Sequence, residues 1–180
     1  MEKYIALLRG INVGGKNKVS MPILKNAFIE NGFSDVTTYI NTGNVLFSSK
    51  SKDREELQTA CRRIIMEKFG LDIAVMVISA QELSDALSHA PKWWDLDIDS
   101  KHNAFFVIPP ATPPLLIEAV GDENPEYALV SHYGQIIFWS APIQTFTRTK
   151  WSKAVSSKAY SNITIRNSNT TKKLLELALK

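Results

Sequence analysis

A glycine-rich, basic loop directly follows the first apolar segment and is the best candidate for a binding site. Gly10 and Gly15 stand at the spacing of the phosphate-binding pattern G-x-x-x-x-G-K-[ST], and Lys16 supplies its lysine. Asn17, however, replaces the hydroxyl residue that would hold magnesium, and no apolar strand elsewhere ends in a convincing metal-binding aspartate. The next helix is expected to start only after Ser20, its N-cap. The loop therefore fails as a nucleotide-triphosphate loop.

Two interpretations of this loop stay open. Glycine permits positive φ and exposes backbone N–H groups, so the loop is suited to cradle a smaller anion or a nucleic-acid phosphate. The donors would then be Arg9, Asn12, Gly14, Gly15, Lys16 and Lys18. In the other interpretation the glycines only turn the chain and the lysines are solvated.

Length and composition place the chain among ordinary globular proteins. Its 180 residues, 44% of them hydrophobic, suit one domain or two small, closely packed subdomains. No apolar run approaches about 18 residues, and the amino terminus shows no signal-peptide pattern. We therefore expect a cytoplasmic protein without a membrane segment. The single cysteine, Cys61, falls on the apolar stripe of a helix and is expected to be a small core residue.

Charge is unevenly distributed along the chain, although the net charge is only +3. Residues 81–140 carry nine acidic and two basic side chains, whereas residues 141–180 carry eight basic side chains and one acidic. The basic segment either attracts a polyanion or neutralises the acidic middle within one folded body. We favour the second explanation.

The first half of the chain predicts the element order βαββαβ from apolar periodicity and turn signals. Strands are expected at 3–8, 36–40, 45–48 and 73–78, helices at 21–31 and 53–69, and a hairpin turn at 41–44. The apolar residues of the first strand run almost unbroken, which favours a strand covered on both faces. Ser79 and Glu82 have the form of a capping box that opens a further short helix.

The second half repeats this order after a linker that contains Trp93 and Trp94. Strands are expected at 104–108, 127–131, 135–140 and 163–166, helices from Pro113-Pro114 to 120 and at 149–158, and a last helix at 170–179 with Asn169 as N-cap. We predict an α+β protein with two tandem ferredoxin-like (βαββαβ) subdomains, packed into one body, plus a C-terminal helix. Their expected bounds are 1–90 and 103–180, joined by the linker 91–102.

Three motifs resemble those of the bacterial family catalogued as Domain of Unknown Function 1697. They span residues 8–19 (LRGINVGGKNKV), 38–45 (TYINTGNV) and 164–170 (TIRNSNT). The resemblance covers nearly the whole chain and implies a pair of ferredoxin-like subdomains in tandem, but no established reaction, substrate or cofactor. Two positions depart from the family pattern: Ser168 stands where a tryptophan is common, and Thr42 where serine is common.

Carried over position by position, the resemblance implies a set of candidate site residues with donor side chains. These are Arg9, Asn12, Lys16, Lys18, Tyr39, Asn41, Asn44, Lys153, Arg166, Asn167 and Asn169. Asparagine, arginine and lysine suit hydrogen bonding to an anion better than proton transfer near neutral pH.

Three functions fit the sequence, and we rank them in order. The first is binding of a phosphate-bearing ligand, either nucleic acid or a nucleotide. The second is a structural or protein-interaction scaffold, and the third is a small enzyme of unspecified reaction. The aromatic RNA-recognition strand is absent, so nucleic-acid contacts would be to phosphates. His89, His102 and His132 show no metal-ligand spacing, so we expect no metal or cofactor. No oligomeric state is indicated.

Overall fold

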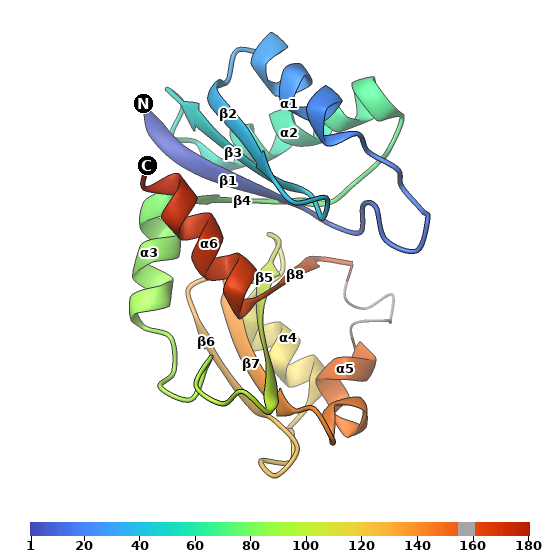
Figure 1. The fold of residues 1–180 in the computed structure, drawn as a ribbon, viewed down its shortest axis with the longest axis vertical. Coiled ribbons are helices and arrows are strands. Elements are labelled where there is room, and N and C mark those ends of the chain that lie inside the picture. The colour runs from blue at the N-terminus through green and yellow to red at the C-terminus, as the bar shows by residue number, and fades with distance from the viewer. Residues whose placement is uncertain (155–160) are drawn as a thin grey trace. The chain divides into compact units, whose positions relative to one another are not determined.

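The strands form two separate four-stranded antiparallel sheets in the part of the chain that the structure describes, residues 1–154 and 161–180 (Figure 1). The structure is a computed structural model. Two units can be distinguished: unit one comprises residues 1–84 and 173–180, and unit two comprises residues 85–172. Among the described residues, no helix has both the length and the apolar character needed to cross a membrane.

Unit one has the element order expected from the sequence. Its elements are β1 (Glu2–Leu8), α1 (Met21–Glu30), β2 (Ser34–Tyr39), β3 (Asn44–Ser49), α2 (Arg54–Phe69), β4 (Val75–Ser79) and the start of α3 (Ala80–Ser88). The strand order in the sheet is β2-β3-β1-β4, with β1 and β3 in the centre.

Both helices α1 and α2 pack on one face of this sheet. Leu24 and Phe28 of α1 and Ile64 of α2 are buried together with Ala6 of β1. Side chains on the other face of β1, such as Ile5, are also fully buried. This confirms the expectation from the unbroken apolar run that β1 is covered on both faces.

The helix boundaries in unit one follow from local capping. Asp53 accepts hydrogen bonds from the Glu55 and Glu56 N–H groups at the start of α2. Ser79 and Glu82 form the predicted capping box, since each side chain bonds the other residue's backbone N–H, at 3.1 and 2.9 Å.

Unit two repeats the strand order of unit one. Its elements are β5 (Ser100–Val107), α4 (Pro113–Val120), β6 (Leu129–Tyr133), β7 (Ile136–Pro142), the 3-10 turn η1 (Phe146–Arg148), α5 (Lys150–Ala154), β8 (Ile163–Asn167) and the start of α6 (Ser168–Ala178). The sheet order is β6-β7-β5-β8. Trp139 and Trp151 lie in the core between this sheet and helices α4 and α5. All residues from Ile136 to Trp139 are buried, as predicted for a sheet covered on both sides.

Several boundaries in unit two differ from the sequence prediction, among them those of β6, which spans Leu129–Tyr133 in place of the expected 127–131. Strand β5 begins at Ser100 and not at Ala104, so residues 100–102 of the expected linker are strand residues. The first residues of β5 have polar side chains, so the apolar pattern that predicts a strand begins only at Ala104. Helix α6 begins at Ser168, because the side chain of Asn167 accepts a 2.8 Å hydrogen bond from the Thr170 N–H and is the N-cap in place of Asn169. The predicted helix 149–158 is seen as α5, and its residues 155–158 lie outside the described residues.

The turn between β2 and β3 is shifted by one residue from the prediction. Asn44 is the first residue of β3, and the turn consists of residues 40–43. Gly43 has φ +82°, a conformation that residues with a side chain rarely adopt. A Cβ atom at this position would lie 2.7 Å from Leu8 Cβ and 2.9 Å from a side-chain carbon of Ile11. Glycine is therefore required here both by conformation and by space.

We expect Gly43→Ala to lower the free energy of unfolding by about 2 to 4 kcal/mol, because positive-φ strain and overpacking add. Gly70→Ala is the matched control, since Gly70 has φ +66° but nothing within 4 Å of its built Cβ. It should cost only about 1 kcal/mol. Urea unfolding of both variants measures the difference, and equal losses would show that the close approach to Leu8 is misplaced.

Candidate functional site

The glycine-rich loop leaves the central strand of unit one and is anchored on both sides. The Leu8 N–H donates to the Gly43 carbonyl at 2.8 Å, and the Arg9 N–H donates to the Ala74 carbonyl at 3.0 Å. The loop therefore starts from a point fixed by the turn before β3 and by the residue before β4.

Residues 12–18, which we name the glycine hairpin, contain a tight two-residue turn at Gly14 and Gly15. Gly14 and Gly15 have φ +58° and +75°, the pair of positive values typical of a type I′ turn. The Lys16 N–H donates to the Val13 carbonyl, and the Asn12 N–H donates to the Asn17 carbonyl, both at 3.1 Å. The loop is thus a small hairpin and does not wrap around a phosphate like a nucleotide-triphosphate loop. Helix α1 begins only at Met21, as predicted.

The side chain of Asn12 holds the base of the glycine hairpin. Its Nδ2 donates to the carbonyls of Val19 and Asn41, each at 2.9 Å, and its Oδ1 accepts from the Val19 N–H at 2.8 Å. Asn17 adds a bond from its Nδ2 to the Gly10 carbonyl at 3.0 Å. Both amides of Asn12 and Asn17 are therefore directed to backbone groups, which fixes the hairpin and joins it to the turn before β3.

The outer part of the glycine hairpin is exposed and basic. Residues 13–18 are all exposed to solvent. Within residues 1–154 and 161–180, the ammonium groups of Lys16 and Lys18 and the N–H groups of Gly14 and Gly15 have no protein partner. The sequence contains no acidic residue between Glu2 and Glu30. The hairpin thus presents unused donors without a nearby carboxylate from its own segment.

The turn before β3 brings three further candidates close to the hairpin. Asn44 is fully buried, and its Nδ2 donates to the Tyr39 carbonyl at 2.9 Å and to the Thr42 hydroxyl at 3.2 Å. Asn41 is exposed and offers its carbonyl to Asn12. Tyr39 ends β2 and is half-buried. Through the bond between Asn12 and the Asn41 carbonyl, the turn that carries the second family motif supports the loop that carries the first.

The candidates of the carboxy-terminal segment lie in unit two. Lys153 is exposed on α5. Arg166 on β8 is buried, and its guanidinium donates to the Thr164 hydroxyl at 2.9 Å and to the Ile165 carbonyl at 2.7 Å. Burial lowers the pKa of Arg166 to about 10. Asn167 and Asn169 lie at the start of α6.

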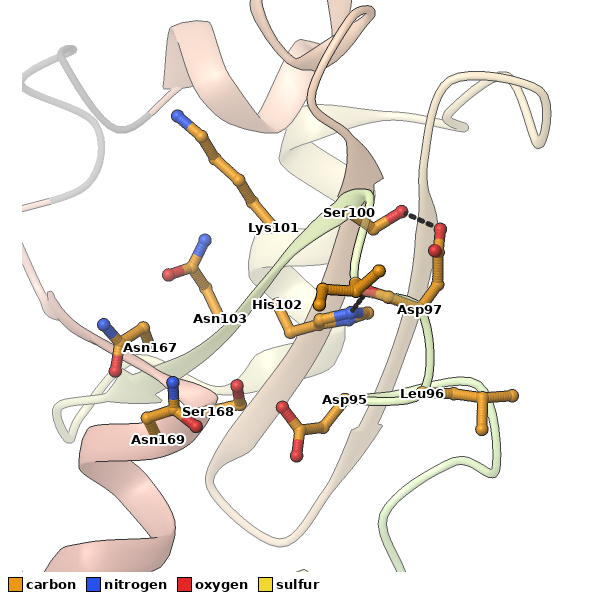
Figure 2. Close-up of a pocket in the computed structure, with 11 residues that line it drawn as sticks. Asp95, Leu96, Asp97, Ser100, Lys101, His102, Asn103, Asn167, Ser168 and Asn169 are labelled. Atoms are coloured by element: carbon orange, nitrogen blue, oxygen red, sulfur yellow. Dashed lines mark hydrogen bonds between the residues drawn. The ribbon is translucent and has the colours of Figure 1, made fainter.

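Asn167 and Asn169 line a pocket of about 590 Å³ in unit two (Figure 2). We name it the β5-edge pocket. Its lining comes from residues 95–98, 100–103 and 167–169. It lies where β8 ends at Asn167, while its partner β5 extends further back to Ser100. The shorter strand therefore leaves space beside the first residues of β5.

His102 lines this pocket but does not offer a free ring nitrogen. Its Nε2 lies 2.6 Å from the Asp97 carbonyl, and its Nδ1 lies 2.6 Å from the Ser140 hydroxyl. Because a carbonyl can only accept, Nε2 carries a proton and donates. Both nitrogens are thus engaged in joining β5 to β7 and to the segment before β5. Among the described residues, no group of three or more histidine, cysteine or acidic side chains is arranged to hold a metal ion.

The two carboxylates of the pocket are ionised and held by local donors. Burial alone would raise the pKa of Asp95, but hydrogen bonds from Lys172 and Ser168 hold it below the ordinary value of 3.8. The Ser100 hydroxyl and the Asp99 N–H, at 2.7 and 2.9 Å, lower the pKa of Asp97 in the same way.

Comparison with known proteins was made on sequence and on structure. The profile of the family described as "Protein of unknown function (DUF1697)" matches residues 1–138. The chain belongs to this family. The structure of the conserved bacterial protein SP0830 from Streptococcus pneumoniae is similar to this DUF1697 protein, with a TM-score of 0.86, 26% identity and coverage of 98% of both chains. The search of curated proteins found no match to this chain.

Sequence reasoning on this DUF1697 protein missed most of the β5-edge pocket. Asp95, Asp97, Lys101 and His102 fall in the expected linker 91–102, and Asn103 precedes the expected strand 104–108. One sequence signal indicates the earlier start of β5. Lys101 and Asn103 alternate with His102 and Ala104 before the apolar run, as in a strand with one polar face. Ser168, noted only for replacing a tryptophan, bonds the Asp95 carboxylate.

The ion pair between Lys172 and Asp95 predicts a pH-dependent effect on stability. Because the folded-state pKa of Asp95 is depressed, its contribution is present above the ordinary value of 3.8 and is lost as the pH falls through the lower folded-state value. Lys172→Ala should therefore lower the free energy of unfolding at pH 7 by about 1 kcal/mol or less, since Lys172 is more than half exposed, and the loss should shrink under acid.

Lys92→Ala is the matched control, because Lys92 is exposed and, within the described parts of the chain, has no acidic partner. NMR titration of the Asp95 carboxyl provides a second readout, with its pKa rising in Lys172→Ala but not in the control. An unchanged Asp95 titration would contradict this assignment.

Proposed function

We propose that this DUF1697 protein binds a phosphate-bearing ligand through the glycine hairpin, and that this ligand is the backbone of a nucleic acid. The observation that carries the proposal is an exposed, braced hairpin whose lysines and glycine N–H groups have no partner in the described residues. Lys16 and Lys18 supply charge, and Gly14 and Gly15 supply backbone donors. Arg9 adds charge at the base, and Asn12 is a positioning residue.

The exposure of the hairpin favours a polyanion over a discrete nucleotide. A small-molecule site normally encloses most of its ligand. Here residues 13–18 are exposed, and the hairpin extends away from the sheet of its own unit (Figure 1). An exposed basic tip can contact a phosphate backbone, where counterion release contributes affinity without enclosure.

The composition of the hairpin supports contacts that do not depend on nucleotide sequence. It contains no aromatic side chain on which a base could stack. The amides of Asn12 and Asn17, which could otherwise contact base edges, donate hydrogen bonds to backbone carbonyls. Phosphate contacts position a protein but carry no sequence information.

We further infer that both units are ferredoxin-like subdomains in tandem. This is supported by the element order βαββαβ in each unit and by the equivalent strand orders β2-β3-β1-β4 and β6-β7-β5-β8. Ferredoxin-like units occur in many unrelated proteins, so the fold itself adds little to the functional argument.

A scaffold role is the second candidate function, and a specific observation favours it. Asn12, Asn17 and Asn44 all direct their amides to groups of unit one, as expected if the motifs only stabilise turns. On that account the lysines of the hairpin would contact only solvent, and their removal would change no binding property.

The two functions are distinguished by a lysine double variant. We expect Lys16→Ala/Lys18→Ala to weaken binding of single-stranded RNA and duplex DNA, alike for different sequences. The slope of log K against log salt should fall by about 0.9 per lost duplex phosphate contact and about 0.7 per single-strand contact. Fluorescence anisotropy over a salt series measures both quantities.

Lys50→Ala serves as the matched control, because Lys50 is an exposed lysine of unit one outside the hairpin. It should bind like the wild type. Equal affinity of the double variant and the wild type, or no binding by either, would refute the proposal and favour the scaffold. Saturable thermal stabilisation by one nucleotide, following RT ln(1 + [L]/Kd), would show that the ligand is a discrete nucleotide and not a nucleic acid.

A further inference from the structure

We infer that the β5-edge pocket is a second, independent binding site, and that it takes a small zwitterion of the amino-acid type with an apolar side chain. Its volume of about 590 Å³ falls within the range of roughly 300 to 1,000 Å³ that small-molecule sites occupy. All its lining residues belong to unit two, so the site does not rest on the glycine hairpin.

One group of side chains in the pocket has unused donors. We name Lys101, Asn103, Asn167 and Asn169 the donor wall. In the described chain the side chains of Asn103 and Asn169 have no hydrogen-bond partner, and Asn167 uses only its Oδ1, as the N-cap of α6. Lys101 Nζ lies 4.0 Å from the centroid of the Phe146 ring and has no carboxylate partner there. These groups are suited to hold a carboxylate.

The second group is acidic and is named the acidic wall. Asp95 and Asp97 are fixed by Lys172, Ser168 and Ser100, and both stay ionised at neutral pH. Their remaining lone pairs can accept hydrogen bonds from an ammonium group. In Figure 2 the three asparagines lie together on the left, and Asp95 and Asp97 lie to their right. Charges of opposite sign thus occupy different sides of one pocket.

This charge arrangement selects the ligand class. Asp95 and Asp97 would repel a polyanion. A simple cation would be repelled by Lys101 and would leave the asparagine amides of the donor wall without an acceptor. A ligand that carries one carboxylate and one ammonium is complementary to both walls. The pocket is therefore unsuited to the phosphate backbone that the glycine hairpin is proposed to contact.

The rim of the pocket is apolar. Leu96 and Ile98 have relative exposures of 78% and 92%, among the highest of the large hydrophobic side chains in the described residues. Covering them with an apolar ligand side chain removes this surface from water. His102, with both nitrogens engaged, forms a fixed part of the lining and is assigned no chemical step.

Calorimetric titration of the full chain with L-leucine tests the inference. We expect saturable binding, weakened at least tenfold for N-acetyl-leucine, which lacks the ammonium, and for leucinamide, which lacks the carboxylate. Lys101→Ala/Asn169→Ala should weaken leucine binding at least tenfold, and Asp97→Asn should weaken it while leaving N-acetyl-leucine unaffected. Lys92→Ala is the control, and urea unfolding verifies that each variant is folded.

Several outcomes would overturn the inference. These are no heat of binding with L-leucine up to its solubility, equal affinity for N-acetyl-leucine or leucinamide, or unchanged leucine binding in Lys101→Ala/Asn169→Ala. Inorganic phosphate binding more tightly than leucine would likewise overturn it in favour of an anion site. The hairpin variant Lys16→Ala/Lys18→Ala should bind leucine normally, so failure of either proposal is seen separately.

Discussion

The close approach of Gly43 to Leu8 and Ile11 is the constraint on which the amino-terminal motifs depend. It lets the Gly43 carbonyl accept from the Leu8 N–H and places the turn before β3 directly against the base of the glycine loop. The Asn41 carbonyl then lies within reach of Asn12, whose side chain also holds both backbone groups of Val19. Two segments that are separate in sequence thereby become one support for the glycine hairpin.

The glycine hairpin combines a hydrogen-bonded base with an exposed tip that carries the unused donors. Residues that are buried or hydrogen-bonded, such as Asn12 and Asn44, hold the backbone, and the groups left over at the tip are ammonium and N–H donors. A preorganised donor set loses less conformational entropy on binding than a mobile loop. The β5-edge pocket in unit two has a different character, because groups of opposite charge lie on different sides of one pocket.

Much of the fold could be predicted from sequence because local signals agreed with the tertiary structure. The Ser79 to Glu82 capping box and the apolar periodicity of the strands are examples. The start of β5 was missed since Lys101 and Asn103 are polar where strands are usually apolar. Residues 10–17 resemble a phosphate loop in spacing, although the two adjacent glycines at 14 and 15 equally favour a type I′ turn. The pocket combines residues 95–103 with residues 167–169, which are distant in sequence and which periodicity cannot bring together.

Amide chemical shifts of the labelled 180-residue chain, followed during titration with a short DNA duplex, test the central claim most directly. The account predicts that the largest changes occur at the Gly14 and Gly15 N–H groups, which have no partner within the described residues. These changes should disappear as the salt concentration is raised, because phosphate contacts are screened. Changes centred on any other surface while the Gly14 and Gly15 amides stay unshifted would contradict the claim.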